Sequence, residues 1–97
     1  MESTVVKNII KYLNSLDNCR AIKTSGDAKR AGEPDIDCVY CGQSIKLEVK
    51  RPGNNRVTKL QQAMLQKWAD AGAVVGVVHS VDEVKELFQE KLKGGNI

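Results

Sequence analysis

The spacing of apolar residues along the first half of the chain predicts one helix followed by three short strands. Near the N-terminus, apolar residues recur at intervals typical of one buried helix face, namely Val5, Val6, Ile9, Ile10, Leu13 and Leu16. Strand-like runs follow at residues 19–23, 34–39 and 45–50. The turn at residues 40–44 contains Gly42, so the second and third strands are expected to pair as a hairpin.

A second helix is predicted from a capping signal at Thr58. Gln61 stands three residues later, so the two residues can form a capping box in which each side chain bonds the other's backbone N–H. Gly72 is expected to end this helix. Its predicted buried face consists of Leu60, Met64, Leu65 and Trp68.

One more strand and one more helix complete the predicted order αβββαβα. Residues 73–78 form an entirely apolar run of strand length, which is typical of a strand covered on both faces. Ser80 and Glu83 have the spacing of a second capping box before a last helix, and residues 93–97 are expected to be a frayed tail. This order predicts an α/β fold in which helices flank a mixed sheet.

Length and composition favour a single globular domain over residues 1–97. The chain has 97 residues, of which 41% are hydrophobic and 28% charged, and these are ordinary proportions for such a domain. The longest apolar run, residues 71–78, is far shorter than the roughly 20 residues that span a bilayer. The first residues do not resemble a secretory signal. We therefore expect a cytoplasmic protein without a membrane partner.

Cysteine content and charge narrow the expected compartment and partners. The three cysteines are an odd number, which disfavours a disulfide scaffold and fits a reducing compartment. The net charge is only +3, but ten of the 15 Lys and Arg residues lie between residues 20 and 67, together with five of the 12 acidic residues. This distribution suits a polyanion partner beside a metal site, although an ordinary solvated surface has similar charge runs.

The candidate chemistry lies in the predicted hairpin, at Asp35 and in the strand that ends at residue 50. Side chains alternate between the two faces of a strand, so Lys46, Glu48 and Lys50 should share one face while their apolar neighbours face the core. If the hairpin pairs as expected, Asp35 lies beside Glu48. Two adjacent carboxylates repel each other unless a cation neutralises them, and carboxylate oxygens are ligands that Mg²⁺ prefers. With a neighbouring lysine, such a site suits phosphodiester hydrolysis.

The same strand face also has a simpler interpretation. Lys46, Glu48 and Lys50 could form weak cross-strand ion pairs on a solvated hairpin surface, without a catalytic role. Short motifs of acidic and basic residues occur by chance in many unrelated chains, so the surrounding sequence has to decide between the two interpretations.

Further segments along the chain add to this pattern. In order, the segments are Gly32-Glu33-Pro34-Asp35, Glu48-Val49-Lys50-Arg51-Pro52-Gly53, Thr58-Lys59-Leu60-Gln61, Ala71-Gly72-Ala73 and Val77-Val78-His79-Ser80. Together they resemble the virus-type replication-repair nuclease (VRR-NUC) family of the PD-(D/E)XK nuclease superfamily. The resemblance runs from residue 2 to about residue 84 and is nearest to small stand-alone members, many of them from phages and their hosts. It implies a restriction-endonuclease-like core and a divalent-metal-dependent DNA endonuclease.

The resemblance implies specific roles for the candidate residues. Asp35 and Glu48 would bind Mg²⁺ or Mn²⁺, with the backbone carbonyl of Val49 as a third protein ligand. Lys50 would be the catalytic lysine, which orients or deprotonates the attacking water and stabilises the transition state. Gln61 would correspond to the family's glutamine after the catalytic strand, although its place in the capping box also explains a glutamine there.

Two further acidic residues have open assignments. Glu2 corresponds to the family's first-helix glutamate and could reach the metal through water, but the helix dipole alone also favours an acid in a first helical turn. Asp37 shares a strand face with Asp35 and could hold a second metal, but we expect it to be a surface acid.

The cysteines and the single histidine predict no further site. Cys38 and Cys41 have the spacing of a zinc hairpin, but tetrahedral zinc needs two more ligands, and Cys19 and His79 stand at no recognised spacing. We therefore expect ordinary hairpin cysteines and a histidine that ends the buried strand. A zinc-stabilised interaction domain built on Cys38 and Cys41 is the minor alternative.

Basic residues flank the candidate site on both sides and are candidates for phosphate contacts, namely Lys23, Lys29, Arg30, Arg51, Arg56 and Lys59. The chain has one Trp, one Phe and two Tyr, which favours recognition of DNA backbone and shape over base stacking.

Stand-alone family members form homodimers that act on branched DNA such as Holliday junctions, so the resemblance implies that substrate and assembly. The main alternative is a non-catalytic DNA- or RNA-binding module on the same basic face. A restriction-type nuclease for a short duplex sequence is disfavoured, because no segment is left over for sequence recognition.

Overall fold

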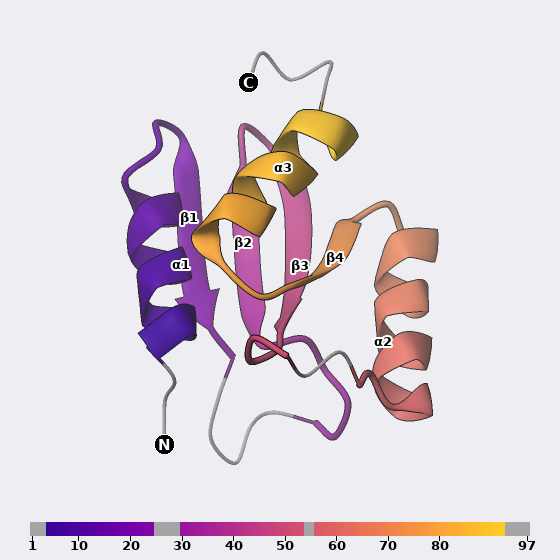
Figure 1. The fold of residues 1–97 in the computed structure, drawn as a ribbon. Helices are drawn as coiled ribbons and strands as arrows, with labels where there is room; N and C mark the ends of the chain where they lie inside the picture. The colour runs from indigo at the N-terminus through magenta and orange to yellow at the C-terminus, as the bar shows by residue number, and fades with distance from the viewer. Residues whose placement is uncertain (1–3, 25–29, 54–55, 93–97) are drawn as a thin grey trace.

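The computed structural model describes residues 4–24, 30–53 and 56–92, and its helices and strands follow the predicted order αβββαβα. In chain order they are α1 (Thr4–Asn14), β1 (Cys19–Lys23), β2 (Ile36–Tyr40), β3 (Gln43–Val49), α2 (Lys59–Asp70), β4 (Val74–Val78) and α3 (Val81–Lys91) (Figure 1). The predicted α/β fold class is confirmed. Glu2, Lys29 and residues 93–97 lie outside the described residues. No helix in the described part of the chain is long and apolar enough to span a membrane.

The described strands form one mixed sheet in the order β1-β2-β3-β4. Strands β1, β2 and β3 pair in antiparallel fashion, whereas β4 is parallel to β3. The hairpin turn between β2 and β3 consists of Cys41 and Gly42, whose φ angles of 50° and 83° are both positive, as in a two-residue type I′ turn. Because this turn is tighter than expected, β2 and β3 lie closer to it than the predicted bounds of 34–39 and 45–50.

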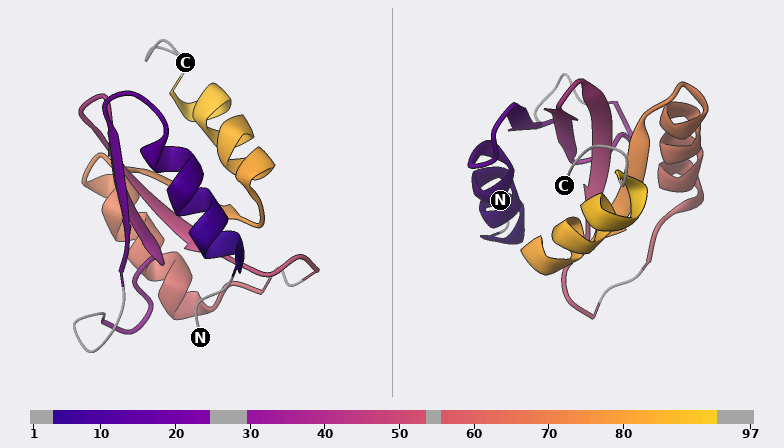
Figure 2. Two further views of the ribbon diagram at one scale, coloured as in Figure 1. Left: turned by 90° about the vertical axis from the view of Figure 1, so that its left-hand side faces the viewer. Right: turned by 90° about the horizontal axis from the view of Figure 1, so that it is seen from above.

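The core lies between the sheet and helices α1 and α3, while α2 packs on the opposite side of the sheet (Figure 2). Side chains that point into this core are almost completely buried, including Ile9 and Leu13 of α1, Ile36, Cys38, Ile45 and Leu47 of the sheet, and Val84 and Phe88 of α3. They lie four residues apart in the helices and two apart in the strands, which are the periods that place residues on one face. Burial of these apolar side chains is the main stabilising contribution to the fold.

Strand β4 lies at the edge of the sheet, beside β3. Helices α2 and α3 both contact it, in agreement with its apolar sequence. Val78 is buried, but residues 74–77 are only half-buried, because within the described chain one edge of β4 lacks a neighbouring strand. The expectation of a strand fully covered on both faces is therefore corrected for these four residues.

The buried face of α2 is narrower than predicted. Leu65 is buried, and Met64 and Trp68 are half-buried. Leu60, by contrast, is 47% exposed. Its side chain packs against the loop at Gly32, where a Cβ added to the glycine would come within 2.6 Å of Leu60 Cγ. Its assignment to the buried face is therefore wrong.

The start of α3 forms half of the predicted capping box. Ser80 Oγ accepts a hydrogen bond from the Glu83 N–H at 3.1 Å, as an N-cap residue does. The Glu83 carboxylate, however, accepts from the N–H of His79 at 2.9 Å, one residue before the N-cap. The same oxygen lies 2.9 Å from His79 Nδ1, so the carboxylate is held by the histidine that ends β4.

Candidate active site

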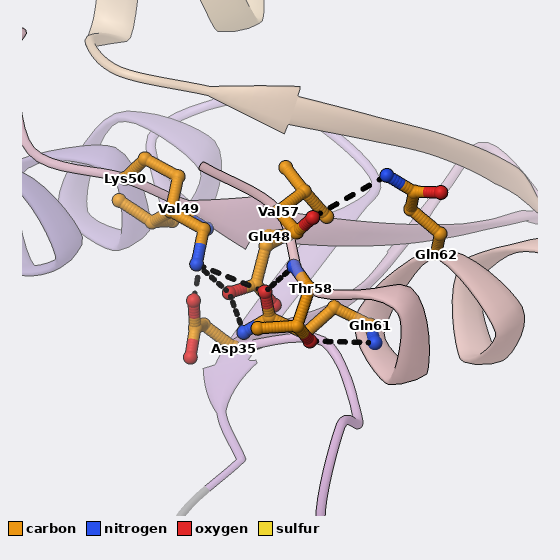
Figure 3. A network of polar contacts seen from close by, with 8 residues as sticks. All are labelled: Asp35, Glu48, Val49, Lys50, Val57, Thr58, Gln61 and Gln62. Carbon is orange, nitrogen blue, oxygen red and sulfur yellow. Dashed lines mark hydrogen bonds and ion pairs between the residues drawn. The ribbon is translucent and has the colours of Figure 1, made fainter. Parts of the chain in front are cut away.

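The strand topology brings three segments that are distant in sequence to one end of the sheet. Because β2 is antiparallel to β3, the residue before β2 lies next to the last residues of β3. The first turn of α2 lies at the same end (Figure 1). Asp35, Glu48, Lys50 and Gln61 meet there in one polar network (Figure 3).

Asp35 is held from both sides by backbone contacts. The register pairs Ile36 with Leu47, which brings Asp35 beside Glu48 as the sequence predicted. The N–H of Val49 donates to Asp35 Oδ2 at 2.9 Å. The N–H of Thr24, just after β1, donates to the Asp35 carbonyl at 2.9 Å. The carboxylate is therefore tied to β3, and the backbone of Asp35 is tied to the residue that follows β1.

Glu48 is a buried carboxylate whose two oxygens have different environments. Oε2 accepts a hydrogen bond from Gln61 Nε2 at 3.0 Å and lies 3.4 Å from Lys50 Nζ. Oε1 is buried and accepts no hydrogen bond from any described residue. Burial, together with the neighbouring charge of Asp35, raises the pKa of Glu48 to about 7, and the smaller opposing effect of Lys50 does not cancel this rise.

The alternative of a solvated hairpin face is wrong for the centre of this strand. Lys46 is only 9% exposed and Glu48 only 3% exposed. Both are covered by α2, since Gln61 bonds Glu48 and the Lys46 ammonium lies 4.0 Å from the centre of the Trp68 ring. Charged groups in such positions need specific partners, because water no longer solvates them.

Gln61 joins the lysine to the carboxylate and also takes part in the helix cap. Its Oε1 accepts hydrogen bonds from Lys50 Nζ and from the Thr58 N–H, both at 3.0 Å. Thr58 Oγ1 in turn accepts from the Gln61 N–H at 3.1 Å, which completes the predicted capping box. Both donors to Oε1 can only donate, so the amide nitrogen must face Glu48. The capping contact and the site contact are thus made by one side chain.

The donor set around Asp35 and Glu48 fits a divalent cation. Two adjacent carboxylates, of which Glu48 is buried, has a raised pKa and carries an oxygen without a hydrogen-bond donor, are stabilised by a hard cation, which prefers oxygen ligands. Among the described residues, no group of three or more His, Cys, Asp or Glu side chains could hold a metal. A cation here would therefore complete its coordination with a backbone carbonyl and water. The carbonyl of Val49 is the predicted candidate.

The remaining acidic and basic candidates surround this network. Asp37 pairs with Lys46, whose Nζ lies 2.6 Å from its Oδ1, across the β2–β3 register. Lys23 ends β1 and is half-buried. Four basic residues are exposed in the segments that lead to and from the site, namely Arg30, Arg51, Arg56 and Lys59.

The cysteines lie on the other side of the sheet from the network or in the hairpin turn. Cys38 faces the core, with its sulfur 3.5 Å from that of Cys19, and burial raises the pKa of its thiol above the usual range. Cys41 is exposed in the turn. Within the described chain these thiols and His79 do not gather into a set of three metal ligands, so tetrahedral zinc coordination has no basis in this geometry.

Sequence reasoning missed the contacts that join α2 to the strands around the site. Trp68 Nε1 donates a hydrogen bond to Glu33 Oε1 at 2.8 Å. The ring of the same tryptophan receives the Lys46 ammonium. Trp68 was predicted only as part of an apolar helix face, and nothing in the local sequence links it to a glutamate 35 residues away.

Solved structures that share this fold over nearly the whole chain include two described as VRR_NUC domains. One, described as a "VRR_NUC domain protein", has a TM-score of 0.69 and 16% identity, and the match covers 96% of this chain and 92% of that one. Another, described as a "VRR_NUC domain", has a TM-score of 0.74 and 26% identity, with coverage of 90% and 92%. No family model and no curated protein matches the sequence.

The structural matches support a VRR-NUC family assignment. The 16% match shows the common fold, and the 26% match adds sequence similarity over the same region. The resemblance seen in the sequence motifs therefore agrees with the three-dimensional comparison. The VRR-NUC neighbours support a nuclease-like domain, with the polar network at the end of its sheet as the candidate active site.

Proposed function

We propose that residues 1–97 form a divalent-metal-dependent endonuclease domain that hydrolyses phosphodiester bonds in DNA. The observation that carries this proposal is the buried Glu48 carboxylate, whose Oε1 accepts no hydrogen bond from a described residue and which adjoins a second carboxylate, Asp35. Asp35 and Glu48 would hold Mg²⁺ or Mn²⁺, with the carbonyl of Val49 as the third protein ligand. The VRR-NUC neighbours favour nuclease chemistry over other uses of such a carboxylate pair.

The residues of the network have different roles in the proposed hydrolysis. A divalent cation bound there would lower the pKa of a water molecule and withdraw negative charge from the phosphate. Lys50 provides fixed positive charge, which orients the attacking water and stabilises the charge that develops on the phosphate oxygens. Water attacks phosphorus and the bond to one sugar oxygen breaks, leaving a phosphate end and a hydroxyl end. Gln61 holds the Lys50 ammonium and the Glu48 carboxylate in their relative positions.

The proposed substrate is branched DNA, such as a Holliday junction, cut by a homodimer in the cytoplasm. Exposed basic residues at the same end of the sheet are available for phosphate contacts, namely Arg30, Arg51, Arg56 and Lys59. One chain of this size covers few base pairs, whereas two linked sites can nick two strands symmetrically. The three free cysteines suit the reducing cytoplasm.

A cleavage assay tests this proposal. A labelled four-way junction and a linear duplex of matched sequence are incubated with Mg²⁺, Mn²⁺ or EDTA, using wild type and Lys50→Ala. We expect metal-dependent cutting of the junction that is lost in the variant, with the variant still folded by circular dichroism.

The other outcomes of this assay identify what has failed. Cutting of both DNA substrates would keep the nuclease and remove the preference for branched DNA. Binding of DNA without cutting in either metal would contradict the enzyme and favour a non-catalytic nucleic-acid-binding module.

A further inference from the structure

A tryptophan outside the polar network contacts both of the strand segments that carry the proposed metal ligands. We propose that Trp68 and Glu33 are positioning residues, which hold Asp35 and Glu48 at the spacing that a divalent cation requires. This inference rests on the proposed function, because it concerns the same metal site. It goes further because it proposes that a side-chain contact between α2 and the loop before β2 maintains the geometry of that site.

The first contact of Trp68 fixes the loop that leads to Asp35. The indole N–H donates to Glu33 Oε1 at 2.8 Å, two residues before Asp35. The preceding glycine lets the loop approach α2 closely, since Gly32 has φ +84° and a Cβ there would come within 2.6 Å of Leu60 Cγ. On its other side the loop is tied to Thr24 through the carbonyls of Pro34 and Asp35. The loop is therefore held between β1 and α2.

The second contact of Trp68 fixes the strand that carries Glu48. The Lys46 ammonium lies 4.0 Å from the centre of the Trp68 ring, a cation–π distance, and 2.6 Å from Asp37 Oδ1. Lys46 precedes Glu48 by two residues and shares its strand face. Since Lys46 is only 9% exposed, its ammonium depends on the ring and on Asp37 for stabilisation.

Taken together, the two contacts join α2 to the loop before β2 and to β3, each at a residue two positions from a proposed metal ligand. Residues that orient metal ligands affect metal affinity strongly, because coordination tolerates little error in ligand position. Loss of the Glu33–Trp68 hydrogen bond would let the loop shift relative to α2 and carry the Asp35 backbone with it. We therefore expect weaker metal binding before any general loss of folding.

The test measures Mn²⁺ binding to the 97-residue chain through the electron paramagnetic resonance signal of free Mn²⁺. Trp68→Phe keeps an aromatic ring but lacks the N–H donor, and Glu33→Ala lacks the acceptor. Glu33→Gln retains an acceptor oxygen and serves as the conservative rescue. Gln66→Ala is the matched control, because it removes an exposed hydrogen bond to Asp70 elsewhere on α2. Thermal unfolding of each variant is recorded alongside.

We expect Trp68→Phe and Glu33→Ala to bind Mn²⁺ about 10-fold more weakly than wild type, while Glu33→Gln and Gln66→Ala stay close to it. Equal affinity across all variants would overturn the positioning role, as would a Glu33→Gln variant as weak as Glu33→Ala. If Trp68→Phe does not fold, the two Glu33 variants decide by the same criterion. A wild-type protein that neither binds Mn²⁺ nor cuts DNA would instead contradict the proposed function, and the positioning role with it.

Discussion

At the scale of single residues, the proposed metal site depends on the protonation of Glu48. Its pKa is raised to about 7 from an ordinary value of 4.5, mainly by burial and then by Asp35. The folded protein therefore binds this proton more tightly than the unfolded chain. The resulting contribution to stability is complete below about pH 4.5 and is lost as the pH rises through about 7.

Stability in EDTA should therefore fall with pH in wild type more than in a Glu48→Gln variant. A rise of this size in the pKa corresponds to about 3 kcal/mol in the free energy of unfolding between pH 4.5 and pH 8. Urea unfolding of both proteins across this range measures the difference. Parallel pH profiles for the two proteins would show that Glu48 is not the buried, destabilised carboxylate described above.

The sequence predicted much at this scale, but not the burial of these side chains. The alternation of residues 45–50 correctly placed Lys46 and Glu48 on the face opposite the core. Their burial comes from α2, which begins ten residues after β3 ends and covers this face by tertiary packing. Strand periodicity identifies which residues share a face, and it contains no information about which helix covers that face.

At the scale of elements, the start of α2 has a structural function in the helix cap, and we propose that it also has a function in the site. The capping box between Thr58 and Gln61 determines the orientation of the Gln61 amide, and through it the donor that faces Glu48. These two functions can be separated experimentally, because glutamate serves in a capping box as well as glutamine does.

Gln61→Glu should keep the helix and impair the site. The helix cap is retained, but the donor to Glu48 Oε2 becomes a second negative charge, so we expect DNA cleavage to fall by about 10- to 100-fold while circular dichroism shows the same helix content. Gln62→Glu is the matched control, because it adds the same charge one residue later, where the side chain makes an exposed bond to the Val57 carbonyl. Equal cleavage rates for the two variants would contradict a site function of Gln61.

Element order was predictable because each element carries a local signal. The capping residues, the apolar periodicity and the turn at Gly42 are all read within a few residues of one another. The length of the turn at Gly42 was not predictable, because Cys41 adopts a φ of 50° that a non-glycine residue rarely takes. The bounds of the two flanking strands shifted with the length of this turn.

At the scale of the whole molecule, long-range contacts bring the strands, helices and loops that carry the site residues together. The sheet order places β4 at an edge, which its apolar sequence did not indicate. The Glu33–Trp68 hydrogen bond joins residues that are 35 apart in sequence, and the local sequence around them does not indicate it. The order of the motifs along the chain indicated the family. The motifs lie far apart in sequence and come together only in the folded protein, so their joint presence in one chain reflects that fold.

The central claim is that Asp35 and Glu48 form the metal site of a nuclease, and calorimetric titration with Mn²⁺ tests it most directly. Wild type, Asp35→Asn and Glu48→Gln are compared at pH 8, with Asp70→Asn at the exposed end of α2 as the matched control. We expect saturable binding in wild type and the control, and loss of binding in both site variants. Undiminished Mn²⁺ binding in the two site variants would contradict the claim.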